Sequence, residues 1–434
     1  MNRRDILKQT ALLGMAPFLP GFDKAKIETA LNKEEAGRQQ IPDTVEKKLT
    51  DDRRKARSRI RRIIMNNDGG DSLVHTDRPI SRELYLARRM FGIIHSQVDT
   101  VMYCTGVTNF YTHRSSITER QTSKGRSYLN AYLDSKNTDT LEVMVNFCKQ
   151  YNKEIFWSMR MNDTHDSGEG ELINQFKRDN PHLMMATKEN RSPHLRNRWS
   201  ALNYGFSEVR QMVVNNIQDV ISRYDVDGIE LDFFRHPHFF RGQFYNEEVT
   251  QEDCNKMTDM VRKIRKLCDR EARQRKRPVL ISIRVPDSLK FSKAIGLDWE
   301  QWLREELIDM VTGADYLKFE PWTHLVAIGN KYNIPVYAGI EQRRLMPGNK
   351  FTNAEEESIA ELWRGEAYSA WMAGINGIYT FNRFNPHDSL FQELGDPTLL
   401  EGLPRQKGES FTTDKSKGMF SAEFWLKGGN KFLH

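Results

Sequence analysis

Short apolar segments alternate with longer amphipathic ones along most of this chain, from residue 63 onward. The short segments carry apolar residues at almost every position or at every second position, which favours β-strands. The longer segments repeat apolar residues three and four positions apart, which favours helices. Eight segments are predicted as strands: 62–68, 98–106, 154–163, 226–234, 279–286, 308–319, 334–341 and 375–383.

Helical segments separate these strands. They cover 81–97, 141–153, 208–224, 254–268, 297–307 and 355–373. Strands that alternate with helices form a parallel sheet, and eight such pairs close into an α/β fold, the (β/α)8 TIM barrel, for which residues 62–400 leave ample length. An open doubly wound sheet is the alternative fold. However, no glycine-rich phosphate-binding fingerprint follows the first strand, where an open sheet of that type usually carries one.

The first 30 residues resemble a bacterial twin-arginine export signal. Paired arginines stand in NRRDILK, residues 2–8, and a modest apolar run, TALLGMAPFLPG, follows over 10–21. That run is shorter than the roughly 20 residues of a membrane helix, so we expect no membrane span. We expect the export machinery to carry the chain to the periplasm or out of the cell. An ordinary basic amphipathic start is the alternative.

Residues 31–61 and 401–434 flank the predicted barrel. The first segment is charged and helix-friendly, which is typical of a linker or a surface helix. The second is rich in Gly, Lys and Phe, and the start of a small β appendage is one interpretation of it. The four cysteines show no metal-type spacing, and Cys254 and Cys268 lie about 21 Å apart on one predicted helix. That separation exceeds disulfide reach, so all four are interpreted as structural.

The charge pattern argues against one class of partner. The net charge is +6 and 29% of the residues are charged, but acidic residues nearly match the basic ones and are scattered among them. A nucleic-acid-binding protein would concentrate its basic residues on one face. We therefore expect a soluble globular protein with no nucleic-acid partner, while an anionic substrate remains compatible.

The segment DGIELDFFRHP, residues 227–237, places charge inside a predicted strand. Alternation puts Glu230 and Asp232 on one face of the strand and the apolar Leu231 and Phe233 on the other. In a barrel the apolar face packs under the helices. The two carboxylates are therefore predicted to point into the barrel.

Other strands repeat this pattern. Alternation turns polar side chains inward on the third, fifth and seventh strands, namely Ser158, Arg160 and Asn162, then Ser282 and Arg284, then Tyr337 and Glu341. Polar groups thus collect at the carboxyl ends of the strands, where barrel enzymes hold their active sites. A structural ion-pair network is the alternative for any single residue. It explains the whole set less well, because burying charge is costly.

Two motifs resemble a known family. LDFFRHP, residues 231–237, is similar to the FDYIRFP-type strand-four motif of bacterial glycosyl-hydrolase-like TIM-barrel proteins, and SMRMNDTHD, residues 158–166, resembles their strand-three segment. The resemblance extends over residues 62 to about 385. It implies a carbohydrate-active enzyme with Asp232 at the catalytic or sugar-binding centre. The residues that it implies around the same pocket are Arg160, Asp163, His165 and Arg235.

The fourth strand also resembles the DGIDLDWE pattern of chitinase-type hydrolases. The acid that protonates the glycosidic oxygen in that pattern falls at Phe234 in this chain. A phenyl ring has no proton to give, so a substrate-assisted chitinase mechanism is not expected.

Hydrolysis of a glycosidic bond by two carboxyl groups is the predicted function. It needs one protonated carboxyl as the acid and a second carboxylate as nucleophile or base. Asp232 ranks first for these roles, Glu341 second, and Glu230, one pleat deeper, third. The predicted substrate-binding residues are Arg160, Asn162, Asp163, His165, Arg235, His236, Arg284, Trp322 and Asn382. The arginines among them favour an acidic or sulfated polysaccharide or oligosaccharide.

Other chemistries find less support in the sequence. His236 and His238 with Asp232 lack a convincing third metal ligand, no G-x-S-x-G elbow is present, and no metal or cofactor is predicted. A non-catalytic carbohydrate-binding barrel is the main alternative, and the distances between the carboxyl groups would distinguish it from a hydrolase. An aldolase or isomerase would use a lysine at a strand end, for which Lys318 is the one candidate inside a strand pattern.

Overall fold

The computed structural model describes residues 43–68, 81–121, 126–168, 173–195, 198–245, 247–346, 356–406 and 408–433. The chain divides into two units, Met1–Thr50 and Asp51–His434. The first unit is described only from residue 43, where helix α3 (Asp43–Arg57) begins. The predicted export signal, residues 1–30, lies outside the described residues.

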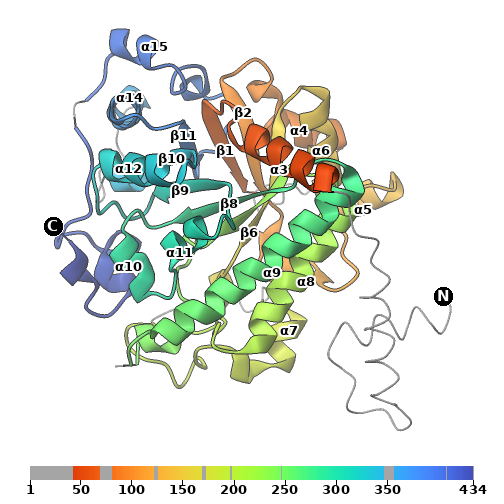
Figure 1. Cartoon of the computed structure of the whole chain (residues 1–434), viewed down its shortest axis with the longest axis vertical. Coiled ribbons are helices and arrows are strands. Elements are labelled where there is room, and N and C mark those ends of the chain that lie inside the picture. The colour runs from red at the N-terminus through yellow and green to blue at the C-terminus, as the bar shows by residue number, and fades with distance from the viewer. Residues whose placement is uncertain are drawn as a thin grey trace. The chain divides into compact units, whose positions relative to one another are not determined.

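Eight parallel strands in the second unit close into a barrel (Figure 1), which confirms the predicted (β/α)8 fold and excludes the open sheet. All eight predicted strands are present. They are β1 (Ile63–Asp68), β2 (Val98–Cys104), β6 (Glu154–Arg160), β7 (Gly228–Asp232), β8 (Leu280–Val285), β9 (Met310–Ala314), β10 (Val336–Glu341) and β11 (Ile378–Phe381). Each strand pairs with the barrel strand next in sequence, and β11 closes on β1. Short strands β3 (Gly106–Val107), β4 (Phe110–Tyr111) and β5 (Glu119–Arg120) form a separate small sheet.

Helices follow the strands along the chain. The six predicted helices correspond to α4 (Arg82–Arg89), α6 (Thr140–Gln150), α8 (Ser207–Arg223), α9 (Gln251–Arg275), α11 (Trp299–Arg304) and α14 (Glu356–Ala373). Further helices are α5 (Arg126–Ser135), α7 (Gln175–Asp179), α10 (Leu289–Ala294), α12 (Trp322–Tyr332) and α13 (Gln342–Leu345). Capping residues fix several starts. Asp139 accepts the first amides of α6, and Thr250 and Asp253 form a reciprocal capping box on α9.

The register of the strands brings the predicted polar side chains to matching levels. Glu230 pairs with Ser158 on β6 and Ser282 on β8, and Asp232 pairs with Arg160 and Arg284 one pleat further along. Apolar side chains fill the barrel below them.

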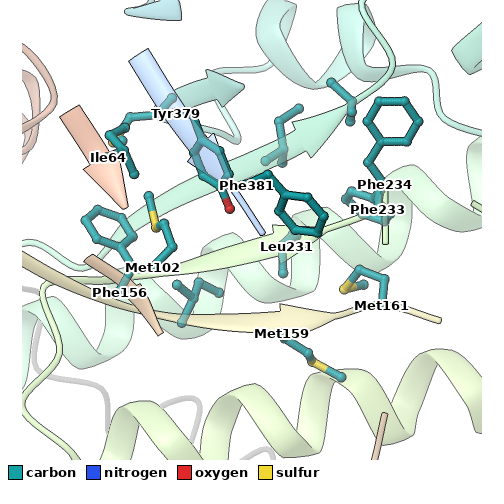
Figure 2. Close-up of a cluster of buried hydrophobic side chains, with 14 of the residues drawn as sticks. Ile64, Met102, Phe156, Met159, Met161, Leu231, Phe233, Phe234, Tyr379 and Phe381 are labelled. Carbon is teal, nitrogen blue, oxygen red and sulfur yellow. The ribbon is translucent and has the colours of Figure 1, made fainter. Parts of the chain in front are cut away.

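Figure 2 shows how the apolar side chains divide between the two faces of the strands. Phe156 lies near Met102 and Ile64, while Met159 points toward a helix. A Cβ at Gly228 would lie 2.3 Å from the Phe156 ring, so the glycine makes room for that ring.

The amino ends of the strands form a floor of matched ion pairs. Arg61 donates to Glu154 from Nε at 2.6 Å and from Nη2 at 2.8 Å. Thr100 donates a further hydrogen bond to Glu154 at 2.8 Å. Arg265 and Arg53 both bind Asp309, at 2.9 and 2.6 Å. These buried or half-buried charges therefore have partners of opposite sign.

The C-terminal extension packs on the carboxyl ends of the strands. Helix α15 (Pro397–Gly402) leads into it. Its described residues then form the short helix α16 (Ala422–Trp425) and two 3-10 turns, η10 (Gly418–Phe420) and η11 (Gly429–Phe432), with no strand among them. The interpretation as a β appendage is therefore wrong. The physical reason is that its aromatic residues serve as anchors, with Trp425 fully buried, rather than alternating along a strand.

Among the helices that the structure describes, none combines the length and the apolar character needed to cross a lipid bilayer.

Candidate active site at the barrel mouth

Asp232 lies at the end of β7 and is bound as a carboxylate. Arg284, on the neighbouring strand β8, donates from Nε to Oδ1 at 3.0 Å and from Nη2 to Oδ2 at 2.9 Å. Oδ1 also accepts the backbone N–H groups of Phe234 and Arg235 at 3.0 and 2.9 Å. These donors stabilise the ionised form, because a carboxylate only accepts hydrogen bonds. Both Asp232 and Arg284 are buried, so their attraction is screened less than on the surface.

Asp315 follows β9 and shares the same arginine. Arg284 donates from Nη1 to Oδ2 of Asp315, so one guanidinium bridges two carboxyl groups. Oδ1 of Asp315 has no hydrogen-bond partner among the described residues. Burial raises the pKa of Asp315 to about 7, with Arg284 acting against the shift and the charge of Glu341 adding to it. A substantial fraction of Asp315 is therefore protonated near neutral pH.

The backbone at the end of β9 turns Asp315 inward. Thr312 pairs with the inward-facing Arg284, so simple alternation would send residue 315 to the outer face. Ala314 and Asp315 have φ angles of +66° and +126°, in a region that L-residues rarely adopt. Such conformations cost of order 1–3 kcal/mol each and cluster at functional sites. Two in succession at the mouth mark Asp315 as a functional candidate.

Glu341, at the end of β10, is surrounded by donors. Its Oε2 accepts the backbone N–H groups of Arg343 and Arg344 at 2.6 and 3.2 Å. Its Oε1 accepts Arg343 Nε at 2.8 Å and the amide of Asn382 at 3.3 Å. The predicted residues Glu341 and Asn382 are thus brought together. Like Asp232, Glu341 is held as an acceptor.

Glu230 lies deeper in the barrel and is fully buried. Its Oε2 accepts the hydroxyls of Ser158 at 2.5 Å and Tyr379 at 3.2 Å, and its Oε1 has no partner among the described residues. Burial raises the pKa of Glu230 to about 8, and the charge of Asp232 adds to this, whereas Arg284 opposes it. Glu230 is therefore protonated at neutral pH. Its hydrogen-bond partners among the described residues are hydroxyls and not an arginine.

A second cluster forms at the end of β6. Arg160 binds Asp68 from Nη2 and Asp163 from Nη1, the latter at 2.7 Å. Asp163 also accepts the backbone N–H and the ring Nδ1–H of His165, at 2.9 and 2.7 Å. Burial alone would raise the pKa of Asp163, but His165 and Arg160 outweigh it and hold the pKa well below its usual value.

Arg235 connects the two clusters. It donates from Nη1 to the hydroxyl of Tyr316 and from Nη2 to Nε2 of His165, the latter at 3.2 Å. The guanidinium also lies over the Phe381 ring, 5.6 Å from its centroid. No acidic side chain pairs with Arg235 among the described residues.

Asp163, His165 and His236 are the group whose spacing best suits a metal ion, with their candidate ligand atoms within 4.8 Å of one another. These candidate ligand atoms already have hydrogen-bond partners, however. Asp163 is bound to Arg160 and His165, and Nδ1 of His236 accepts the Thr164 amide at 2.9 Å. The guanidinium of Arg235 also contacts His165. This surrounding of cations suits an anion better than a metal ion.

Other predicted residues have different surroundings. The Asn162 amide donates to the carbonyls of Leu202 and His238, and its oxygen accepts the Leu202 amide, so it joins two loops. Trp322 begins α12, is fully buried and lies under Lys318, whose Nζ is 4.2 Å from the ring centroid. Their roles in substrate binding stay predictions. Nζ of Lys318 donates to Glu409 at 2.6 Å. Lys318 is therefore not counted among the residues of the candidate site.

Aromatic side chains of the C-terminal extension cover part of the mouth. Trp425 stacks on His236 and on Tyr316, with centroid distances of 6.1 and 6.5 Å. Phe420 lies 6.0 Å from Tyr316 and beneath the guanidinium of Arg343. The extension is therefore a wall of the candidate site, and the rings of Phe420 and Phe424 in it are half-buried.

Sequence reasoning missed three residues of this site: Asp315, Tyr316 and Arg198. The first two lie inside the sixth predicted strand, 308–319, but just beyond the end of β9 at Ala314, so a search around each strand end would have found them. Arg198 lies in the long connection between β6 and β7, where no periodic pattern gives a side chain its direction.

Comparison with known families gives one match. Residues 95–323 match the model of a family described as glycosyl hydrolase-like 10. No curated protein matches the chain.

Solved structures share the barrel. The PgaB (BpsB) glycoside hydrolase domain from Bordetella bronchiseptica has a TM-score of 0.51 at 9% identity, over 81% of this chain and 100% of that one. Alpha-L-fucosidase isoenzyme 2 from Paenibacillus thiaminolyticus has a TM-score of 0.48 at 11% identity, over 79% of this chain. This chain spans only 49% of that fucosidase chain. At 9% identity, the likeness to the PgaB domain shows a common fold and nothing further.

Proposed function

The chain belongs to the glycosyl hydrolase-like 10 family, and on that basis we propose that it hydrolyses glycosidic bonds of an acidic or sulfated polysaccharide or oligosaccharide at the barrel mouth. One observation carries the proposal. Arg284 bridges two carboxyl groups, of which Asp232 is bound as a carboxylate while Asp315 has a pKa raised to about 7. Paired carboxyls with environments that push their protonation apart are the usual acid and base of such enzymes.

In the proposed reaction Asp315 gives its proton to the glycosidic oxygen as the bond between that oxygen and the anomeric carbon breaks. Asp232 faces the anomeric carbon, either as nucleophile or as the base that takes a proton from the attacking water. Arg284 fixes both carboxyls in place. The unpartnered Oδ1 of Asp315 is the oxygen free to carry the transferred proton.

Glu341, which the sequence pairs with Asp232, remains a second candidate for the partner. All four donors around it favour its ionised form. Its negative charge helps to raise the pKa of Asp315. We therefore assign Glu341 the role of keeping Asp315 protonated, and its direct participation is the alternative.

The test is reducing-end release over a panel of neutral and acidic polysaccharides, with the anomer of the first product read by proton NMR. Asp315→Asn should lower kcat by about 10² to 10⁴, the usual contribution of a positioned acid. Asp315→Asn should also lose the fall of kcat/KM above about pH 7. Glu341→Gln should retain that fall but shift it to lower pH, because the charge that raises the pKa of Asp315 is gone.

Asp259→Asn, an exposed change on α9, is the matched control and should behave as wild type. If Asp315→Asn turns over normally with its alkaline fall intact, Asp315 is not the acid, and Glu341 takes its place. If the folded wild-type protein releases no product from any member of the panel, the hydrolase assignment is wrong.

Carbohydrate binding without hydrolysis is the second candidate function. The observation in its favour is that Asp232, Asp315 and Glu341 are all buried, so a bound sugar reaches them only if covering side chains move. Tight binding of a glycan to the wild-type protein, with no product over days, would support this function.

Export is proposed on sequence grounds alone. The pair Arg3 and Arg4, followed by a short apolar run, supports transport of the folded chain by the twin-arginine route. The double variant Arg3→Lys, Arg4→Lys should remain in the cytoplasm when the cells are fractionated. Equal amounts of variant and wild type in the periplasm would contradict the assignment.

A further inference from the structure

Two arginines at the mouth differ from the others in their partners. Arg160 and Arg284 each bind two carboxyl groups, and Arg343 binds Glu341. Arg198 and Arg235 form no salt bridge with any carboxylate among the described residues. Arg235 is buried and Arg198 is half-buried. A cation that is withdrawn from water without a counter-ion is costly, so keeping both requires a compensating group.

Arg235 has an unused donor. It is only 9% exposed, and its Nε–H has no hydrogen-bond partner among the described residues. Its Nη groups contact the Tyr316 hydroxyl and Nε2 of His165, and neither partner is a carboxylate. The full positive charge of this side chain is therefore left without an opposite charge.

Among the described residues, Arg198 has only neutral partners: its Nη1 donates to the hydroxyl of Thr164 at 3.0 Å and also faces a ring nitrogen of His236. Its Nη1 lies 2.8 Å from Nε2 of His236, while Nδ1 of His236 accepts the Thr164 amide at 2.9 Å. Burial, with Arg198 and Arg235 adding to it, lowers the pKa of His236 well below its usual value, so the ring is neutral. Its one proton is then on Nε2 and points at Arg198. An anionic oxygen that accepts from both groups relieves this arrangement.

The two arginines are adjacent. The rings of His165 and His236, which contact Arg235 and Arg198 respectively, lie 4.9 Å apart. The carboxylate beside His165, Asp163, is already bound to Arg160 and to His165.

The C-terminal extension and His165 frame this arginine pair. Arg198 lies over the rings of Phe424 and Trp425, 5.9 and 5.7 Å from their centroids. The side chain of His165 is 37% exposed, and Arg198 and Phe424 are half-buried, so solvent reaches the pair from this edge. A sugar that enters there meets a phenyl ring beside two cationic groups.

We propose that Arg198 and Arg235 form an anion subsite that holds the carboxylate of a uronic acid or the sulfate ester of a sulfated sugar. The inference rests on the proposed glycoside hydrolase function and names the substrate class for it. Arg198 and the Nε–H of Arg235 supply charge-assisted donors, His236 Nε2–H supplies a third, and Phe424 is a surface for the sugar ring. Trp425 closes the far side.

Calorimetric titration of the full chain tests the subsite. The probes are inorganic sulfate, tetragalacturonate, the methyl ester of tetragalacturonate, and a sulfated galactan tetrasaccharide with its desulfated form. Each ester or desulfated probe keeps the sugar skeleton and removes the charge. Arg198→Met and Arg235→Met should each weaken binding of the acidic probe about tenfold or more and leave the neutral probe unchanged. Lys266→Met, on the exposed face of α9, removes the same charge elsewhere and should bind as wild type.

The outcomes separate the subsite from the hydrolase function. Loss of acidic-probe binding in Arg198→Met supports the subsite even if Arg235→Met fails to fold, because Arg198 is half-buried and bonds only to neutral groups. A preference for tetragalacturonate assigns uronates, and one for the sulfated probe assigns sulfate esters. Equal affinity for charged and neutral probes, or equal loss in Lys266→Met, overturns the subsite. If neutral glycans are still hydrolysed in that case, the glycoside hydrolase assignment stands, but its restriction to acidic or sulfated substrates falls with the subsite.

Discussion

The floor and the mouth of the barrel are built from the same residue types, but the hydrogen-bonding groups of these residues are not equally well paired at the two ends. On the floor, Arg61 and Glu154 match each other with two direct hydrogen bonds. At the mouth, Asp315 and Glu230 each keep an oxygen without a partner, and Arg235 keeps an N–H without one, among the described residues. A buried ion pair that is complete holds a structure together, whereas unpaired donors and acceptors await a ligand.

The pKa shifts follow this division. Asp315 and Glu230 have raised values near neutrality because burial outweighs the single arginine that they share or approach. Groups that titrate near the working pH can move protons, and perturbed values of this kind cluster at functional sites. The number of charged residues at each end of the barrel therefore does not show which end is functional. The partners of each charged group do.

The largest expected effect is at the mouth. Asp232→Asn should lower kcat by a factor of about 10² to 10⁴, because the amide cannot serve as nucleophile or base. Arg284 keeps Asp315 as a partner in this variant, so the fold should survive. Initial rates and a thermal melt on the same preparation check it. A normal rate with a normal melt would remove Asp232 from the mechanism.

A floor variant should show the opposite profile. Glu154→Gln leaves the buried Arg61 without an ionised partner and should lower the free energy of unfolding by about 3 to 5 kcal/mol. Turnover per folded molecule should not change, because no floor residue reaches the mouth. Denaturant titration and initial rates measure the two effects, with Asp259→Asn as the surface control. A floor variant that loses activity but not stability would contradict the assignment of a structural role to the floor and a functional role to the mouth.

Stability should fall with rising pH through the mouth carboxyls. Glu230 has a pKa near 4.5 when unfolded and about 8 when folded, so the folded state binds its proton more tightly. The stabilisation is complete below about pH 4.5 and is lost as pH rises to about 8, at up to about 1.4 kcal/mol per pH unit. Glu230→Gln should flatten this slope. Unfolding free energies at pH 5, 6, 7 and 8 give the comparison, and an identical slope in the variant would mean that Glu230 is ionised throughout.

Salt should produce the smallest effect. An acidic oligosaccharide held by Arg198 and Arg235 should bind a few-fold more weakly in 0.5 M salt than in 0.05 M salt, on the order expected when the screening length shortens. The floor pairs bind nothing from solution, so thermal stability should change little over the same range. Salt-independent binding of the acidic ligand would assign its affinity to apolar contacts with the aromatic rings.

Much of the architecture was predictable from the pattern of residues. All eight strands lie where apolar segments predict them, because burial on one or both faces leaves a mark on every second position. The alternation of side chains along the strands also placed Glu230, Asp232 and Arg284 inside the barrel correctly. The register puts Asp232 level with Arg284 and Glu230 one pleat deeper. Helix α12, Trp322–Tyr332, was not predicted, because no helix was assigned between the sixth and seventh predicted strands.

The sequence by itself determined the barrel and the inward set on its strands, because periodicity is a local property that each segment carries alone. Only the tertiary structure decided which charged side chains have partners of opposite sign. Asp315 points inward because two left-handed residues break the alternation, and Arg198 reaches His236 through a loop without periodicity. The C-terminal extension places Trp425 against that histidine from 189 positions away in the chain, 425 against 236, and no local pattern encodes a contact over such a separation.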